Sequence, residues 1–184
     1  MTNQFSFAGY KWRGLSTFPE GTSWRHRPQS FVDNTNWEAL CQYASELHDG
    51  ADCTVDPQMA MGCNNLVRIL VFEDGSRWIA RLRLPSINSD ETAEVKSALL
   101  QREVDCLRLV KERTSVPVPA VLGHDTSAEN AIGAPLMLIE CLPGNVAMDM
   151  RRMVFHLHTS HPSTRRWRGS RQACPSFSPA NRED

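Results

Sequence analysis

The feature that most constrains the fold is a pair of apolar segments joined by a short polar turn. Residues 65–72 (NLVRILVF) and 77–84 (RWIARLRL) flank the tetrapeptide Glu73-Asp-Gly-Ser76, and Pro85 comes directly after the second segment. Asp-Gly between two β-branched, apolar runs is a strong hairpin signal, because glycine accepts the positive φ that tight turns require. The sequence therefore predicts a β-hairpin over 65–84, and with it an antiparallel sheet.

Further strands and one long helix surround this hairpin. Residues 53–58, 120–124 and 135–142 have the composition of strands. A helix is expected from about residue 90 to 113, begun by Ser89-Asp-Glu, whose acids favour the positive end of the helix dipole. The order strand, strand, strand, long helix, strand, strand predicts an α+β fold, with a roughly five-stranded antiparallel sheet and the helix packed on one face.

The segments on either side of this sheet differ in character. Residues 1–34 have no helical or strand period and are expected to form a flexible lead. Residues 35–52 predict a short amphipathic helix that begins with a capping box at Thr35-Asn-Trp-Glu38. Residues 149–184 are rich in Arg, Ser and Pro without apolar period, so we expect a disordered basic tail.

Charge and cysteine usage narrow the function classes. The net charge of the whole chain is −1, and the tail from residue 151 holds seven arginines against two acids, so the remaining body is mildly acidic. A mildly acidic protein body is not expected to bind nucleic acid or an anionic membrane surface. The six cysteines are scattered without a C-x-x-C pair, and no leader or spanning segment is apparent, which together predict a cytoplasmic protein.

One strand and the long helix carry the strongest chemical signal. Glu103 falls by its spacing on the apolar helical stripe that should pack on the sheet, where a carboxylate is costly unless a cation meets it. Arg81 and Arg83 alternate onto one face of their strand, so we predict that one of them reaches Glu103. Kinases hold the cation that grips ATP phosphates in this way. A plain structural ion pair, or a Glu103 rotated to the stripe's edge, remains an alternative. The predicted stripe consists of Leu99, Glu103, Cys106, Leu107 and Val110.

The turn at residues 60–65 is a second, weaker signal. Gly62 lets the backbone approach a phosphate closely, and successive amides can line such a turn. The three-glycine pattern of protein kinases is absent. An ordinary hairpin turn is the competing interpretation, because Gly and Asn are the usual turn residues.

Taken in order, five segments resemble the first lobe of the aminoglycoside phosphotransferase and choline kinase-like family, most closely its fungal members. The resemblance covers residues 53–145 and implies a protein kinase-like fold, ATP with magnesium, and transfer of the terminal phosphate to a small hydroxylated or aminated molecule. It defines residues 53–148 as a kinase-like N-terminal lobe. The segments are 62–67 (GCNNLV), 78–85 (WIARLRLP), 100–107 (LQREVDCL), 116–123 (VPVPAVLG) and 132–144 (IGAPLMLIECLPG).

The resemblance also implies roles for individual residues. Gly62 would lie in the loop that covers the nucleotide, and Arg81 would take the place of the phosphate-gripping cation, with Arg83 as its competitor. Glu103 would be the helix partner of that cation. The hinge that meets the adenine edge would consist of Glu140, Cys141 and Leu142.

The sequence departs from the family beyond the first lobe. The family's second lobe carries His-Gly-Asp and a later magnesium-binding Asp, whereas the acids after Asn145 are only Asp149, Glu183 and Asp184. We therefore expect a truncated small-molecule kinase with no catalytic or metal-binding residues of its own, inactive alone and binding ATP weakly at best. The alternatives are a non-catalytic binding or regulatory module, and an unrelated α+β protein.

An apolar surface is expected where the second lobe would pack. Leu142, Val146, Met148 and Met150 have no periodic apolar segment to pack against. An uncovered patch of this kind usually marks a partner or an aggregation liability. The sequence thus predicts self-association, or a partner protein that covers the surface of the missing lobe.

Overall fold

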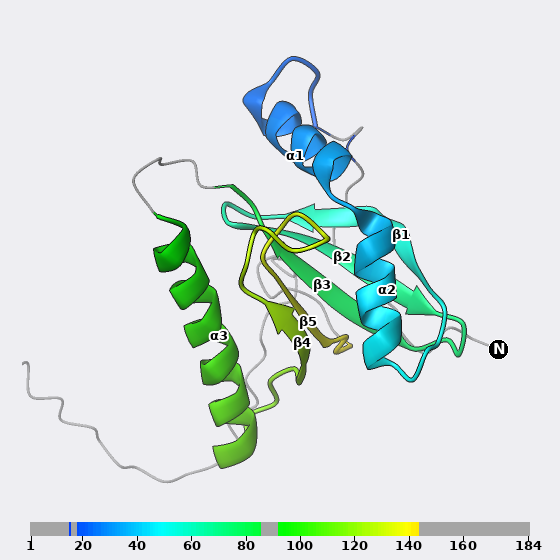
Figure 1. Ribbon diagram of the computed structural model, residues 1–184, viewed down its shortest axis with the longest axis vertical. Coiled ribbons are helices and arrows are strands. Elements are labelled where there is room, and N and C mark those ends of the chain that lie inside the picture. Colours follow the sequence, from blue (N-terminus) through cyan, green and yellow to red (C-terminus); the bar gives the residue numbers. More distant parts are fainter. Residues whose placement is uncertain (1–14, 16–17, 86–91, 144–184) are drawn as a thin grey trace, which may run out of the picture. The chain divides into compact units, whose positions relative to one another are not determined.

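The computed structural model describes residues 15, 18–85 and 92–143, and these form an α+β domain (Figure 1). The five strands make one antiparallel sheet in the order β1-β2-β3-β5-β4, and the predicted fold class is confirmed. The predicted tail, and the predicted helix start at Ser89, lie outside the described residues. The elements are α1 Ser23–Asn34, α2 Trp37–Leu47, β1 Cys53–Met61, β2 Asn65–Phe72, β3 Arg77–Arg83, α3 Ala93–Arg113, β4 Val121–Asp125 and β5 Leu136–Glu140.

The hairpin predicted from Asp-Gly is the β2–β3 pair. Its register runs from Asn65 opposite Arg83 to Val71 opposite Arg77. The Gly75 amide donates to Phe72 O at 2.9 Å, and the Phe72 amide donates to Ser76 O at 3.0 Å. Gly75 alone in this turn has a positive φ, +83°, so the loop is a three-residue one that ends in a left-handed glycine.

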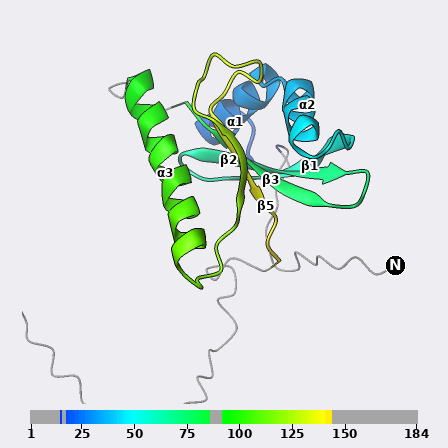
Figure 2. The same ribbon diagram turned by 60° about the horizontal axis from the view of Figure 1, so that its bottom comes forward.

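Helices cover both faces of the sheet (Figures 1 and 2). On one face, Leu40 and Ala44 of α2 and Phe31 of α1 pack on a large core that includes Trp78, Ala80 and Leu82 of β3. On the other face, Leu100 and Val104 of α3 form a smaller cluster with Met137 and Ile139 of β5. Alternate residues of β3 therefore point to opposite sides, which places Arg81 and Arg83 on the α3 side.

Helix α1 corrects the prediction that residues 1–34 form only a flexible lead. Pro28 lies inside this helix, and proline usually breaks a helix because it lacks an amide hydrogen. Its N-cap residue is Thr22, whose hydroxyl donates to Pro19 O at 2.7 Å and does not cap the helix, and no acid lies in the first turn, so the start signals are weak. Burial of Phe31 and Pro28 against the domain stabilises α1 through packing, which no local pattern reveals.

The start of α2 corrects the predicted capping box. Asn36 is the N-cap residue, and its side-chain oxygen accepts a hydrogen bond from the Ala39 amide at 3.1 Å. Thr35 is buried and donates its hydroxyl to Phe31 O at 2.7 Å, so it closes α1 and is not available to cap α2. The helix itself is confirmed, and Tyr43 ties it to the sheet by donating to His124 O at 3.2 Å.

Candidate functional site

The predicted link between strand and helix is present. Arg81 Nη1 lies 2.8 Å from Glu103 Oε1, and Arg83 Nη1 lies 3.8 Å from Glu103 Oε2. The prediction that one of these arginines reaches Glu103, with Arg81 favoured, is confirmed. The Arg81 and Glu103 side chains are 25% and 33% exposed, so this ion pair is partly screened from water yet open to a ligand.

The predicted set of α3 residues that pack on the sheet was partly wrong. Leu100, Val104 and Leu107 of α3 face the sheet. Leu99 is 37% exposed and Cys106 is also exposed, because the helix is rotated so that the sheet contacts the adjacent row of side chains. Glu103 lies at the edge of the packed stripe, one of the alternatives that the sequence left open.

Asn65 completes the environment of Arg81, a role that the spacing of residues in the sequence did not indicate. With its amide turned to satisfy both neighbours, Asn65 Oδ1 accepts from Arg81 Nη2 at 3.1 Å, and its amide nitrogen donates to Asn64 O at 3.2 Å. Asn65 is opposite Arg83 in the β2–β3 register, which makes it a diagonal, same-face neighbour of Arg81. The guanidinium of Arg81 is thus held from two sides, by a helix carboxylate and by a strand amide.

The turn between β1 and β2 holds Gly62 with open space around it. The Gly62 amide donates to Asn65 O at 3.0 Å, and a Cβ at this position would meet nothing within 4 Å. The fold itself therefore does not require glycine here. Behind the turn, both terminal nitrogens of Arg27 donate to Cys63 O at 3.1 Å, and Nη2 also donates to Pro85 O at 2.6 Å. Helix α1 in this way fixes the turn to the end of β3.

The predicted hinge begins at the last residue of β5. Glu140 Oε2 accepts from Lys111 Nζ at 2.9 Å and from the Ala120 amide at 3.0 Å. These two hydrogen bonds, the Ala120 bond foremost, lower the pKa of Glu140. Cys141 is buried, which raises the pKa of its thiol, whereas Leu142 is 39% exposed. The Glu140 carboxylate joins the end of α3 to the sheet, so a hinge role would fall to backbone groups.

These residues lie at different levels along the sheet and do not form one contact cluster. Arg81 is opposite Met137 in the β3–β5 register, three residues before Glu140. At the rise of an extended strand, the hinge position therefore lies roughly 10 Å along β5 from the Arg81 level. The Gly62 turn lies toward the opposite end, because it precedes Asn65, which is opposite Arg83.

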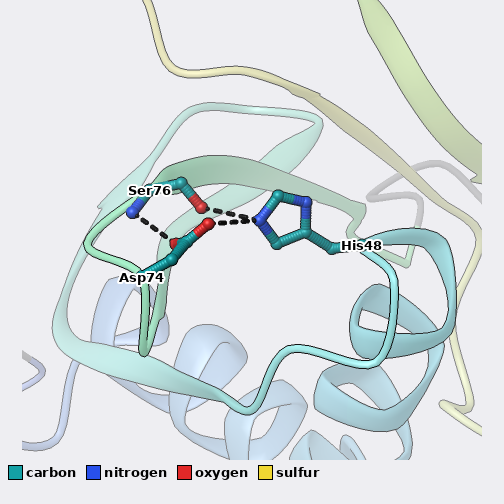
Figure 3. Close-up of polar contacts among 3 residues, drawn as sticks. All are labelled: His48, Asp74 and Ser76. Atoms are coloured by element: carbon teal, nitrogen blue, oxygen red, sulfur yellow. Dashed lines mark hydrogen bonds and ion pairs between the residues drawn. The ribbon is translucent and has the colours of Figure 1, made fainter.

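A second polar cluster joins the end of α2 to the β2–β3 turn (Figure 3). His48 Nε2 lies 2.9 Å from Asp74 Oδ2 and 3.0 Å from Ser76 Oγ, and the Ser76 amide donates to Asp74 Oδ1 at 2.8 Å. Hydrogen bonds from the Ser76 hydroxyl and amide, together with the His48 ring, lower the pKa of Asp74 to about 2. Both Asp74 and Ser76 contact the same ring nitrogen, so the cluster lacks the relay geometry of a catalytic triad. Its role is structural, because it links the end of α2 to the β2–β3 turn.

The described part of the chain offers neither a cluster of metal ligands nor a membrane span. Within residues 15, 18–85 and 92–143, no three His, Cys, Asp or Glu side chains gather as they would around a metal ion. No helix in these ranges is both long and apolar enough to cross a bilayer.

Comparison with known proteins gives one match. The model of the phosphotransferase enzyme family (APH) matches residues 58–166, more than half of the chain. This range contains Gly62, the Arg81–Glu103 pair and the segment after β5. No curated protein and no solved structure matches the chain significantly.

Proposed function

Because the chain belongs to the phosphotransferase enzyme family, we propose that its described domain is the ATP-covering lobe of a small-molecule kinase of the aminoglycoside phosphotransferase and choline kinase type. Magnesium ATP would supply the phosphoryl group, and the acceptor would be a small hydroxylated or aminated molecule. In this proposal the lobe binds and orients the nucleotide.

The observation that carries the proposal is the fixed position of Arg81. Glu103 Oε1 lies 2.8 Å from Nη1, and Asn65 Oδ1 accepts from Nη2 at 3.1 Å. A guanidinium has five N–H donors in a planar fork, so donors remain for an anion while the group is held in place. A cation oriented in advance loses little side-chain entropy when it meets a phosphate.

The neighbouring segments support the same role. The space around Gly62 leaves room for a phosphate beside the turn, and a side chain there would reduce it. The backbone of Cys141 and Leu142 comes directly after β5, where it would meet the adenine edge. Arg83 remains the competitor of Arg81, but its guanidinium lies 3.8 Å from the shared carboxylate and is less firmly held.

The described residues hold only part of what phosphoryl transfer needs. His-Gly-Asp is absent from the 184 residues, and the described residues offer no group of three metal ligands. Phosphoryl transfer needs metal ions on the phosphates and a carboxylate beside the attacking hydroxyl. We therefore propose that this chain binds ATP weakly and does not transfer phosphate by itself.

Titration with ATP tests the proposal. We expect wild-type chain to bind ATP with a dissociation constant in the millimolar range, because half a cleft buries little of the ligand. Arg81→Met should weaken binding about tenfold, as expected for one lost charge-assisted contact. Arg108→Met is the matched control: it removes one positive charge from an exposed position on α3 and should leave binding unchanged.

Two results would contradict the proposal. One is equal loss of ATP affinity in Arg81→Met and Arg108→Met, which would indicate general charge attraction. The other is magnesium-dependent phosphorylation of an aminoglycoside, choline or homoserine by the purified chain. A larger loss of ATP affinity in Arg83→Met than in Arg81→Met would assign the phosphate-binding role to Arg83.

A second candidate function is a binding module whose exposed surface docks a partner protein or a second copy. One face of α3, opposite to the residues that pack on the sheet, exposes Val95, Leu99 and Leu109 at 47%, 37% and 54%. Leu142, after β5, is also exposed. Val146, Met148 and Met150, predicted to form an apolar surface together with Leu142, lie outside the described residues. Apolar side chains gathered on one helical face favour a protein contact.

A further inference from the structure

A cavity of about 540 Å³ lies at the end of the sheet where β3 finishes. Four parts of the chain line it: α1, the end of β3, the first turn of α3 and the loop between β4 and β5. Gly62, Arg81, Glu103 and the residues of the predicted hinge do not line it. The cavity therefore shares only Arg83, the competitor of Arg81, with the candidate nucleotide site, and its volume is in the range typical of small-molecule sites.

The lining of the cavity has one sign of charge. It includes the basic side chains of His26, Arg27, Arg83 and Lys96, and no acid. Among the described residues, the Lys96 ammonium has no hydrogen-bond or ion-pair partner, and the nearest acid to Arg83 is Glu103 at 3.8 Å. Lys96, which has no partner among the described residues, and Arg83, whose ion pair with Glu103 is a long one, both line a concave site and favour an anionic ligand.

The uncharged residues that line the cavity indicate which kind of anion it would bind. Phe31, Leu84 and Pro135 supply apolar surface, and Ser30 and Asn34 of α1 supply hydrogen-bonding groups. We propose that the cavity binds a small phosphorylated metabolite. Its phosphate dianion meets Arg83 and Lys96, and its organic part lies on Phe31 and Leu84. A phosphate suits this pair better than a carboxylate, because it carries more charge and more acceptor oxygens for two cations to share.

Binding in the cavity has a route to the candidate nucleotide site. Arg83 lies between the cavity and Glu103, the partner of Arg81. Arg27 lines the cavity and also holds Cys63 O, next to Gly62. A phosphate that engages Arg83 would draw it from Glu103 and leave that carboxylate to Arg81 alone. This coupling rests on the proposed function of Arg81, whereas binding in the cavity does not.

Amide chemical shifts of the full chain test the inference. We expect phenyl phosphate to shift the amides of Lys96, Gly133 and Ala134, and to bind about tenfold more tightly than inorganic phosphate, because its ring uses the apolar lining. Benzoate, which pairs the same ring with a carboxylate, should bind more weakly than phenyl phosphate. Lys96→Met should weaken phenyl phosphate binding about tenfold. Arg102→Met, which removes a positive charge from an exposed position on the same helix, should not.

Several results would overturn the inference. Equal weakening by Lys96→Met and Arg102→Met would indicate general charge attraction. Phenyl phosphate shifts centred on Gly62 and Arg81 would place the anion in the nucleotide site instead. Benzoate binding as tightly as phenyl phosphate would remove the preference for phosphate. If phenyl phosphate shifts the amides around the cavity but the chain binds no ATP, the inference is supported and the proposed function is contradicted. The two proposals can therefore fail separately.

Discussion

The energetic coupling between Arg81 and Glu103 is open to direct measurement. The two side chains are 25% and 33% exposed and approach to 2.8 Å. Unit charges about 4 Å apart interact by about 4 kcal/mol at an effective dielectric constant near 20, before desolvation and side-chain entropy are subtracted. Fully exposed pairs retain about 0.2–1 kcal/mol. For this intermediate burial we expect a coupling free energy of about 1–1.5 kcal/mol.

A double-mutant cycle measures this coupling. The free energy of unfolding is obtained in urea for wild type, Arg81→Met, Glu103→Gln and the double variant, and the non-additive part is the coupling. Raising the salt concentration to about 1 M should reduce it, because screening is strong at that ionic strength. The matched cycle between Arg83 and Glu103, joined at 3.8 Å, should give about 0.5 kcal/mol or less.

The size of each coupling shows which arginine is held in place. A coupling of Arg83 larger than that of Arg81 would refute the assignment of Arg81 as the fixed cation. A coupling near zero for both would mean that Glu103 does not fix either guanidinium, and the case for an oriented phosphate grip would be lost. Equal m-values across the four proteins are the control that the unfolded states are comparable.

Other parts of the domain give three further predictions. The folded pKa of Asp74, about 2, lies below its ordinary value of 3.8, so its bonds to Ser76 stabilise the fold above about pH 4 and lose this effect as pH falls through about 2. The difference in urea midpoint between wild type and Asp74→Asn should be full at pH 6 and much smaller at pH 2. A Cβ at Gly123 would overlap Leu47 Cδ1, the end of a flexible side chain, so Gly123→Ala should cost about 1 kcal/mol in urea unfolding and Leu47→Ala should restore most of it. Leu109→Asp places a charge on the exposed face of α3 and should reduce self-association in sedimentation velocity, whereas unchanged association would exclude this face.

Features that depend on local sequence were predicted well. The β2–β3 hairpin results from Asp-Gly between two apolar runs, and the order of strands and long helix along the chain follows from the same kind of pattern. The order of the strands within the sheet was not predicted. The two faces of β3 were also predictable, because side chains alternate along a strand. Placing Arg81 and Arg83 on the face opposite Trp78 required only that alternation.

Features that depend on packing between distant segments were not predicted. Helix α1 contains Pro28 and has only weak start signals, and it is stabilised by contacts with the rest of the domain. Asn65 became a neighbour of Arg81 only through the strand register, which the sequence does not state. The cavity beside Lys96 is lined by four separate parts of the chain, so no single sequence motif predicts it.

The position of Glu103 allows a functional interpretation of the ion pair beside a structural one. The sequence placed Glu103 within a buried stripe, where burial alone would have required a cation beside it. At the edge of the stripe, 33% exposed, the carboxylate keeps contact with water, so its burial alone does not require Arg81 as its partner. Yet Glu103 Oε1 lies 2.8 Å from Arg81, and Asn65 holds the same guanidinium from the other side. Two polar groups hold one partly exposed guanidinium in a fixed orientation, which adds to stability and also presents the remaining N–H donors to an anionic ligand.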